Sequence, residues 1–350
     1  MGWNLIAQER ALAALKAALV SGRLPHAFLF AGPEGVGKQT AAWQLAQALN
    51  CTAEASQRPC GQCSQCQRVA GRVHADIQLL TIEGREERRP DGRAAARVKN
   101  ISIAQVREVE QAIALKPYEG RYRVIIIDPA DAMNAEAQNA FLKTLEEPPP
   151  EVVLILISTR EHALLPTIRS RCQPIEFRLA PRLEIEAALQ ERGGEAEQAA
   201  LCSRLAEGRI GTALALAADP KLWEARSEAL AVASGLARQP VRERFLLAER
   251  LAARFSSDSA AVRETLASWR SWWRDVLLLQ SGCPEGVTNT DQWPLLQADA
   301  ENSFPAEVVA FLRALEQTAR YLEYNVNPRL ALEALLLQAP RAANLSQVLS

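Results

Sequence analysis

One stretch near the start of the chain limits what it can fold into more than any other. The apolar run 27–31 leads into Gly32-Pro33-Glu34-Gly35-Val36-Gly37-Lys38, and a helical pattern follows over residues 38–49. Glycines at this spacing let backbone N–H groups turn around a phosphate, the start of the next helix adds positive charge, and the lysine reaches the β and γ oxygens. The stretch therefore predicts a phosphate-binding loop between a core strand and a helix. Its predicted nucleotide-binding residues are Gly32, Gly35, Gly37 and Lys38.

The residues expected to hold Mg²⁺ and water depart from this motif. A serine or threonine after the lysine would hold Mg²⁺ through its hydroxyl, but the chain has Gln39. Thr40 comes one place late, and one residue along a helix is a rotation of about 100°, so Thr40 should face elsewhere. The apolar run 123–128 ends in Asp128, where a P-loop protein has its second acid for the Mg²⁺ shell. Pro129 follows where many such ATPases have the glutamate that orients water, so a general base is missing there.

Four of the seven cysteines form a cluster in the sequence, at Cys51, Cys60, Cys63 and Cys66. Four thiolates at these spacings can surround a tetrahedral Zn²⁺, and the short gaps form tight turns that direct neighbouring sulfurs at one point. A C-x2-C-x2-C run also occurs in iron–sulfur proteins, which is the chemical alternative. The distant first cysteine and the lack of a proline after the run favour zinc. Because four protein ligands leave no open coordination position, we predict a structural zinc site.

The composition is that of an ordinary globular protein, with 48% hydrophobic and 23% charged residues over 350 positions. This length predicts two or three domains. The formal net charge of −1 excludes a global electrostatic attraction to nucleic acid, so any such contact would need a local patch. No signal-peptide pattern precedes the first helical pattern, and the longest apolar runs are strand-sized. Together with clustered cysteines that suit a reducing compartment, these features predict a cytoplasmic protein with no membrane partner.

Up to residue 177, apolar strand patterns alternate with helical patterns, which is typical of a parallel sheet covered on both faces. Residues 83–99 are rich in charge and carry Pro90-Asp91-Gly92, so we expect an exposed hairpin or mobile loop there. Its basic end is a candidate contact for DNA phosphate, but a solvated surface explains it better. The predicted strands are 27–31, 77–82, 123–128, 152–157 and 175–177, and the predicted helices before residue 150 are 8–21, 38–49, 102–115 and 134–147.

The remainder of the chain has helical patterns only. Three of them predict a small helical domain over 182–217, and Asp219-Pro220 marks its boundary. In the long helical part that follows, the spacing of Trp269, Trp272 and Trp273 favours core packing over an exposed recognition surface. The predicted domains are an α/β domain over 1–180, a small helical domain over 181–218 and a larger helical domain over 219–350.

Several stretches together carry a family resemblance. Leu24-Pro25-His26-Ala27 precedes the first strand, Lys143-Thr144-Leu145-Glu146-Glu147-Pro148-Pro149 ends a helix, and Ile168-Arg169-Ser170-Arg171-Cys172 precedes the last strand. With the loop 32–38 and the four cysteines, they resemble the clamp-loader branch of the AAA+ proteins, and most specifically its delta-prime members in bacterial DNA polymerase III. The resemblance covers essentially the whole chain, although the last third is matched only by its helical character and by residues 327–333.

This resemblance implies an AAA+ P-loop core with a zinc module, a small helical lid and a helical oligomerisation collar. It also implies a role in DNA replication, because delta-prime members cap a ring that opens the sliding β clamp and places it on primed DNA. ATP is bound and hydrolysed there by gamma/tau partners, and delta is a further partner. The delta-prime member acts as a comparatively rigid stator.

Site residues carry over from the family by position. Arg171 matches the arginine of the Ser-Arg-Cys motif, which reaches a neighbour's ATP, and such a trans arginine is worth about 10³–10⁵ in rate. Arg169 is a weaker candidate, and within this chain alone an ion pair would explain Arg171. In active relatives the lid helix carries a sensor arginine, at a position that aligns with Gly211. With Gln39 and Pro129 this makes three departures, so the resemblance predicts a subunit that does not hydrolyse ATP, while the retained loop leaves nucleotide binding open.

Two other functions remain as alternatives. A catalytically active ATPase subunit would need Thr40 to replace the missing hydroxyl and another acid, Asp131 or Glu146, to position water. A zinc-dependent DNA-binding module would use the cysteines and the loop 83–99, but a net charge near zero argues against strong independent DNA binding. ATP turnover by the chain alone would favour the first, and a steep salt dependence of DNA binding would favour the second.

Overall fold

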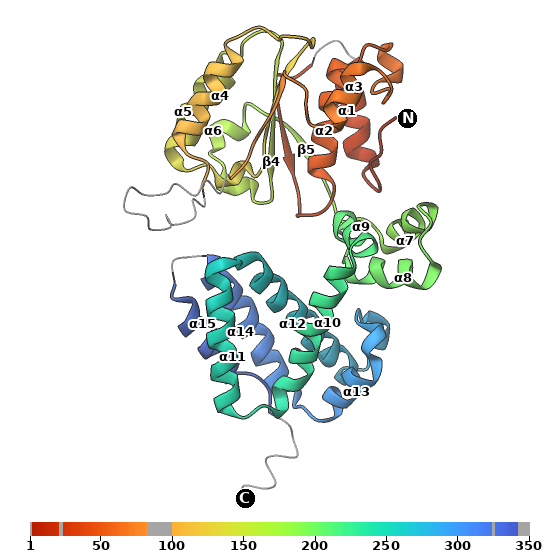
Figure 1. Cartoon of the computed structure of the whole chain (residues 1–350), viewed down its shortest axis with the longest axis vertical. Helices are drawn as coiled ribbons and strands as arrows, with labels where there is room; N and C mark the ends of the chain where they lie inside the picture. The colour runs from red at the N-terminus through yellow and green to blue at the C-terminus, as the bar shows by residue number, and fades with distance from the viewer. Residues whose placement is uncertain (1, 21–23, 83–99, 324–325, 342–350) are drawn as a thin grey trace, which may run out of the picture. The chain divides into compact units, whose positions relative to one another are not determined.

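The structure is a computed structural model of the chain, and it describes residues 2–20, 24–82, 100–323 and 326–341 (Figure 1). The chain divides into two compact units, which are described separately. The first comprises Met1–Ala188 and Ala206–Thr212, and the second comprises Leu189–Leu205 and Ala213–Ser350. The predicted loop 83–99 lies outside the described residues, and the predicted three-domain division stays a prediction.

A five-stranded sheet with the order β2-β3-β4-β1-β5 forms the centre of the first unit. All neighbouring strands are parallel, as their unbroken hydrophobic runs predicted, and every residue of β4 is buried. Because parallel strands end at the same edge of a sheet, the loop after β1 and the acid after β3 lie at one edge. The strands are β1 (Ala27–Ala31), β2 (Ile77–Leu80), β3 (Arg123–Ile127), β4 (Val152–Ser158) and β5 (Gln173–Glu176).

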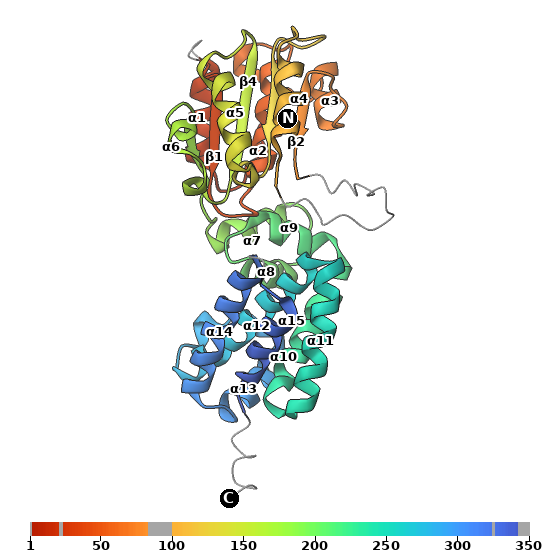
Figure 2. The ribbon, with the colours of Figure 1, turned by 90° about the vertical axis from the view of Figure 1, so that its left-hand side faces the viewer.

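Helices cover both faces of this sheet (Figures 1 and 2). One face carries α1 (Glu9–Val20), α2 (Lys38–Asn50) and α3 (Ser64–Ala70), and the other carries α4 (Ile103–Ile113), α5 (Ala135–Glu146) and α6 (Pro166–Arg169). Successive residues of β3 point to opposite faces. Val124 and Ile126 therefore pack in the core under α1 and α2, and Ile125 and Ile127 pack in the core under α4 and α5.

Local sequence signals fix where these helices begin. Ser102 starts α4 with a capping box, in which its side chain accepts from the Gln105 N–H and the Gln105 side chain accepts from the Ser102 N–H. The Asn134 side chain accepts from the Ala137 N–H and starts α5. Serine and asparagine are both favoured at this position. For the elements that the sequence predicted, the observed ends lie within about two residues of the predicted ones, as is usual for frayed ends.

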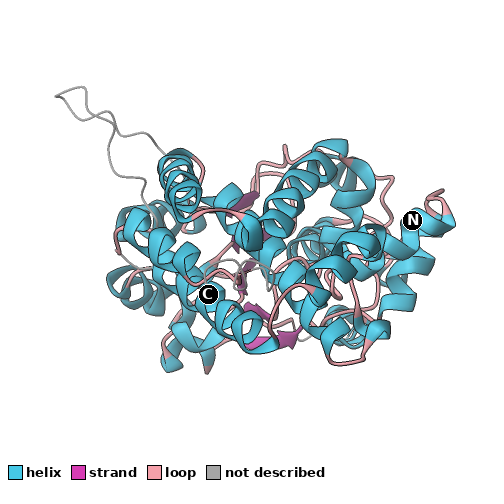
Figure 3. Cartoon of the chain, turned by 90° about the horizontal axis from the view of Figure 1, so that it is seen from below, coloured by secondary structure: helices cyan, strands magenta, loops and turns pink. Residues whose placement is uncertain are grey.

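No strand follows β5 among the described residues, so the chain is α/β and then all-α, as predicted. Helices make up most of what the structure describes (Figure 3). The remaining helices are α7 (Arg182–Glu191), α8 (Ala196–Leu205), α9 (Ile210–Ala218), α10 (Pro220–Gly235), α11 (Val241–Ser257), α12 (Ser259–Gln280), α13 (Trp293–Glu301), α14 (Pro305–Glu323) and α15 (Pro328–Leu337). Short 3-10 turns lie at Ala55–Gln57, Ala130–Ala132, Glu161–Ala163, Leu236–Arg238, Pro284–Gly286 and Thr290–Gln292.

The tryptophans of α12 form the core of the second unit. Trp269, Trp272 and Trp273 are fully buried, and the ring of Trp273 meets that of Phe311 edge to face at 5.9 Å between centroids. The prediction that they pack in the core is confirmed. None of the helices in the described ranges is long and apolar enough to cross a membrane.

Candidate functional site

The predicted phosphate-binding loop is formed, and its three glycines have backbone angles that other residues rarely adopt. The φ angles of Gly32, Gly35 and Gly37 are 148°, 75° and 98°. A Cβ at Gly32 would lie 2.2 Å from the carbonyl oxygen of Phe177, so this position also excludes any side chain on steric grounds. Gly37 sits at the N-cap of α2, which points the start of that helix at the loop.

The Lys38 ammonium bonds to its own loop. Lys38 is the first residue of α2 and is only 6% exposed. Its Nζ donates to the carbonyl oxygen of Gly32 at 2.6 Å and to that of Pro33. Burial lowers the pKa of Lys38, and nearby carboxylates, Asp128 first, act in the opposite direction. The cation is thus satisfied by main-chain acceptors that belong to the loop itself.

The Gln39 amide bonds to the acid that a bound Mg²⁺ would need. Gln39 Nε2 donates to Asp128 Oδ2 at 3.0 Å, although the two residues are 89 positions apart. Burial raises the pKa of Asp128, and the Gln39 hydrogen bond and the Lys38 charge oppose that shift. Thr40 is exposed, and its predicted direction away from the Mg²⁺ position stays a prediction. The position of the metal-binding hydroxyl therefore holds a donor that engages the carboxylate instead of a metal ligand.

A second acid near this edge is also engaged within the chain. Asp131 Oδ1 accepts from Ser158 Oγ at 2.8 Å and from the Thr159 N–H at 3.2 Å. Arg160 Nε donates to Asp131 Oδ2 at 3.2 Å. Sequence reasoning named Asp131 as an acid for positioning water but missed the arginine, because nothing in the local pattern indicates that partner. One carboxylate oxygen of Asp131 accepts from a guanidinium and the other accepts from two donors. Asp131 is therefore poorly placed to act as a general base on water.

The start of α9 lies directly on the loop. The Gly211 N–H donates to the carbonyl oxygen of Gly35 at 2.7 Å, and a Cβ at Gly211 would lie 3.0 Å from that oxygen. Arg209 is close as well, since its Cβ would be 3.2 Å from a Cβ at Gly35. The guanidinium of Arg209, however, pairs with Glu207 at 3.6 Å. Gly211, the position predicted to correspond to the family's sensor arginine, thus makes a close backbone contact in which a side chain would be crowded.

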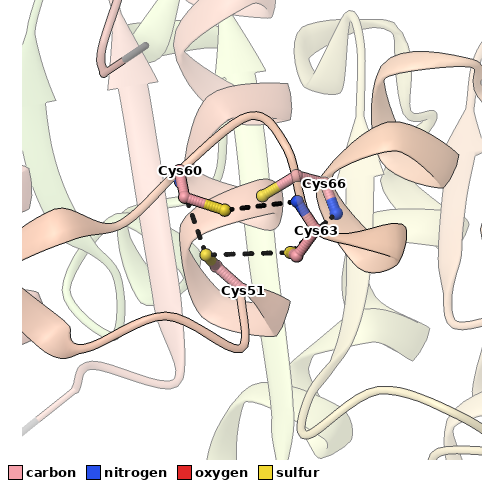
Figure 4. Close-up of side chains that lie close together, drawn as sticks. All are labelled: Cys51, Cys60, Cys63 and Cys66. Atoms are coloured by element: carbon pink, nitrogen blue, oxygen red, sulfur yellow. Dashed lines mark hydrogen bonds between the residues drawn. The ribbon is translucent and has the colours of Figure 1, made fainter.

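The structure brings the four predicted cysteines together (Figure 4). Cys51, Cys60, Cys63 and Cys66 have Sγ atoms that all lie within 4.8 Å of one another, and those of Cys51 and Cys63 are 3.9 Å apart. A tetrahedral Zn²⁺ with bonds of about 2.3 Å puts sulfurs about 3.8 Å apart. An iron–sulfur cluster holds several metal atoms and needs a wider cage, so these distances fit a single ion better. The cluster can bind a metal such as zinc.

Backbone donors prepare these thiols to be ligands. The N–H groups of Cys60, Cys63 and Cys66 point at the sulfurs of Cys51, Cys60 and Cys63 in turn, each at 3.4 Å. The backbone N–H groups of Cys63 and Gln62 lower the pKa of Cys60. Burial opposes ionisation of Cys63, yet donors from Thr52 and Cys66 lower its pKa to about 6. Burial raises the pKa of Cys66. A thiolate is the form that binds a metal, so these donors favour the ligating form of Cys60 and Cys63.

Arg171, the predicted trans arginine, lies at the surface of the first unit. Its Nη2 pairs with Glu146 Oε1 at 2.7 Å, and its Nη1 donates to the carbonyl oxygen of Thr167 at 3.0 Å. Its side chain is 35% exposed. The ion pair that the sequence offered as an ordinary explanation is thus present, and the guanidinium still reaches solvent. Arg169, the weaker candidate, is exposed.

Two family models cover most of the chain. Residues 7–181 match the model described as DNA polymerase III, delta subunit, and residues 220–340 match the one described as DNA polymerase III, delta subunit, C terminal. The delta' subunit of DNA polymerase III from Pseudomonas aeruginosa is 32% identical over 323 residues, which are 89% of this chain and 91% of that protein. The chain belongs to the delta' family of DNA polymerase III subunits. The predicted resemblance to clamp loaders is therefore confirmed.

Two further comparisons place this delta' family chain beside gamma subunits and a gamma-related protein. The gamma/tau subunit of DNA polymerase III from Mycobacterium bovis is 34% identical over 186 residues, which are 53% of this chain. The chain spans only 30% of the length of that relative. A solved structure of a gamma-subunit-related protein from Thermotoga maritima is 21% identical, with a TM-score of 0.46 over 93% of this chain and 97% of that one.

Proposed function

We propose that this delta' family chain is a non-hydrolysing stator subunit of the DNA polymerase III clamp loader, which loads the β sliding clamp onto primed DNA. The observation that carries this proposal is the hydrogen bond from Gln39 to Asp128. It engages the one carboxylate expected in the Mg²⁺ shell, and Pro129 after it offers no group to activate water. Lys38 and Gly211 add to the argument, because both make contacts within the loop where an active subunit would contact phosphate.

The proposed partners are the gamma/tau and delta subunits in the cytoplasm, with the β clamp and primer-template DNA reached through the complex. Support comes from the likeness of 186 residues of the chain to gamma/tau subunits, since subunits of one ring are commonly built from the same module. We further propose that the cysteines hold a structural Zn²⁺, and that residues 1–180, 181–218 and 219–350 serve as core, lid and collar. Binding of ATP at Gly32, Gly35, Gly37, Lys38 and Asp128 is not part of this function.

The active role of the chain would be in trans, through Arg171. A guanidinium stabilises charge that develops on a transferring phosphoryl group, and its planar donors match phosphate oxygens in pairs. The partial exposure of the Arg171 side chain supports this role, because a fully buried arginine could not reach a neighbour's nucleotide.

ATP turnover by the purified chain, alone and with gamma/tau and delta subunits, tests the proposal. We expect no turnover by the chain alone. In the assembled loader, Arg171→Ala should slow ATP hydrolysis at the adjoining gamma/tau site by about 10³-fold or more. The total rate of ATP hydrolysis should therefore fall by the part that this site contributes. Arg169→Ala, which changes the last residue of α6 two positions before Arg171, should cost much less. Turnover by the chain alone that disappears with Lys38→Ala would instead identify an active ATPase subunit.

A further inference from the structure

The partner of Arg171 within the chain has a role of its own. Glu146 is the last residue of α5, and its carboxylate lies 2.7 Å from the Arg171 guanidinium, which comes from the segment after α6. The two residues are 25 positions apart and belong to separate elements. The side chains are 35% and 52% exposed, so the pair is at the surface and open to exchange with a charged group from outside.

The backbone of Arg171 is fixed, whereas its guanidinium is held only by surface contacts, the ion pair with Glu146 and one hydrogen bond to the carbonyl oxygen of Thr167. Ile168 on one side is fully buried and Cys172 on the other is 6% exposed, so both anchor the segment in the core under α4 and α5. The Arg171 N–H donates to the carbonyl oxygen of Ile168 at 3.1 Å. A guanidinium on such a base can swing through its side-chain torsions without any change in the fold.

The hold of Glu146 on the guanidinium is weak enough to be released. Exposed ion pairs are screened by water and salt and contribute little to stability. Glu146 is also at the carboxyl end of α5, where the helix dipole disfavours a carboxylate. A nucleotide phosphate carries more charge than a carboxylate and accepts from the guanidinium in pairs. A neighbour's phosphate would therefore displace Glu146.

We propose that Glu146 is a positioning residue, which holds Arg171 back against its own subunit until a neighbour's nucleotide takes the guanidinium. This rests on the proposed function of Arg171. Glu146 competes with the nucleotide for one cation, so it weakens nucleotide binding at the adjoining site without acting in the chemical step. The distinguishing consequence is that its effect on that site exists only while Arg171 is present.

The test measures the ATP dependence of turnover by the full loader at low ionic strength, taking the Arg171-dependent part as the difference from Arg171→Ala. Glu146→Gln should lower the KM of this part by about 1.4- to 5-fold, the range that a surface ion pair allows, with kcat unchanged. This decrease in KM should become smaller as salt is added, because salt screens the ion pair that the substitution removes. Glu147→Gln is the matched control, because it removes the neighbouring exposed charge and leaves the ion pair intact.

The double variant separates this proposal from the function on which it rests. In the Arg171→Ala background, Glu146→Gln should have no effect on KM. A change in KM as large as the one seen when Arg171 is present would overturn the proposal. The proposal would also be overturned if the loader with Glu146→Gln had the same KM as the loader with Glu147→Gln, or if it had a lower kcat at an unchanged KM. Either result would leave the proposed trans role of Arg171 standing. If Arg171→Ala itself leaves turnover unchanged, the proposed function fails and this one with it.

Discussion

Replacing Asp299 by asparagine should change the pH dependence of stability in the second unit. Asp299 lies in α13 with its side chain 2% exposed. Burial raises its pKa to about 6, although the Trp272 N–H donates to its Oδ2 at 3.0 Å and Arg238 lies 3.5 Å from its Oδ1. At neutral pH this site therefore holds a carboxylate whose charged form is disfavoured by its surroundings. Asparagine has a similar shape, keeps an acceptor for Trp272 and does not titrate.

The sign and size of the effect follow from proton linkage. The folded pKa is about 6 and that of an unfolded aspartate about 3.9, so the folded chain binds more protons between these values. The free energy of unfolding of the wild-type chain therefore falls as pH rises through this window, by about 2–3 kcal/mol between pH 4 and pH 7.5. Asp299→Asn removes that loss. The stability of the variant relative to wild type should rise by the same amount over this range.

Urea unfolding followed by tryptophan fluorescence measures this change. Five of the seven tryptophans (Trp223, Trp269, Trp272, Trp273 and Trp293) belong to the second unit, so the signal reports mainly on it.

Asp291→Asn is the control with the opposite sign. Burial raises the pKa of Asp291, but two hydrogen bonds of 2.8 Å from Arg226 outweigh it and lower that pKa. Its stabilisation is present above the unfolded pKa and is lost as pH falls through the folded one, so Asp291→Asn should destabilise at pH 7.5 and less at pH 4. A difference between Asp299→Asn and wild type that stays constant from pH 4 to 7.5 would refute the linkage argument.

Three further changes test the sites. Cys63→Ser should no longer bind stoichiometric zinc in elemental analysis, whereas Cys283→Ser, which lies outside the cluster, should still bind it. A wild-type chain without metal would contradict the proposed zinc site. Gly32→Ala should lower the free energy of unfolding by about 1–3 kcal/mol in urea titrations, because its φ is 148° and its Cβ would meet a carbonyl oxygen; unchanged stability would contradict the strain. Gln39→Thr should release Asp128 from its hydrogen bond, so that the variant binds ATP about tenfold or more tightly with Mg²⁺ than with EDTA in equilibrium dialysis. Equal binding under the two conditions would contradict the role of Gln39 in blocking the metal position.

The features that the sequence predicts well are those whose cause is local. The glycines of the loop 32–38, the turns between Cys60 and Cys66, and the caps at Ser102 and Asn134 each depend on residues a few positions apart. Hydrophobic runs predicted the parallel sheet because helices cover both faces of such a sheet. Its strands are therefore apolar at consecutive positions and do not alternate between apolar and polar residues. The strand order within that sheet needed the structure, because nothing in one strand identifies its neighbour.

The state of the nucleotide loop shows why the rest could not be predicted. Gln39 and Asp128 were each named from the sequence, one as a missing hydroxyl and one as a retained acid, but their hydrogen bond joins the start of α2 to the end of β3. The contact of Gly211 with Gly35 spans an even greater separation. Read alone, a retained Lys38 favours nucleotide binding. Taken with these contacts, Lys38 belongs to a loop in which its ammonium and the carboxylate of Asp128 are engaged by the chain itself, so a nucleotide with Mg²⁺ would have to displace these hydrogen bonds.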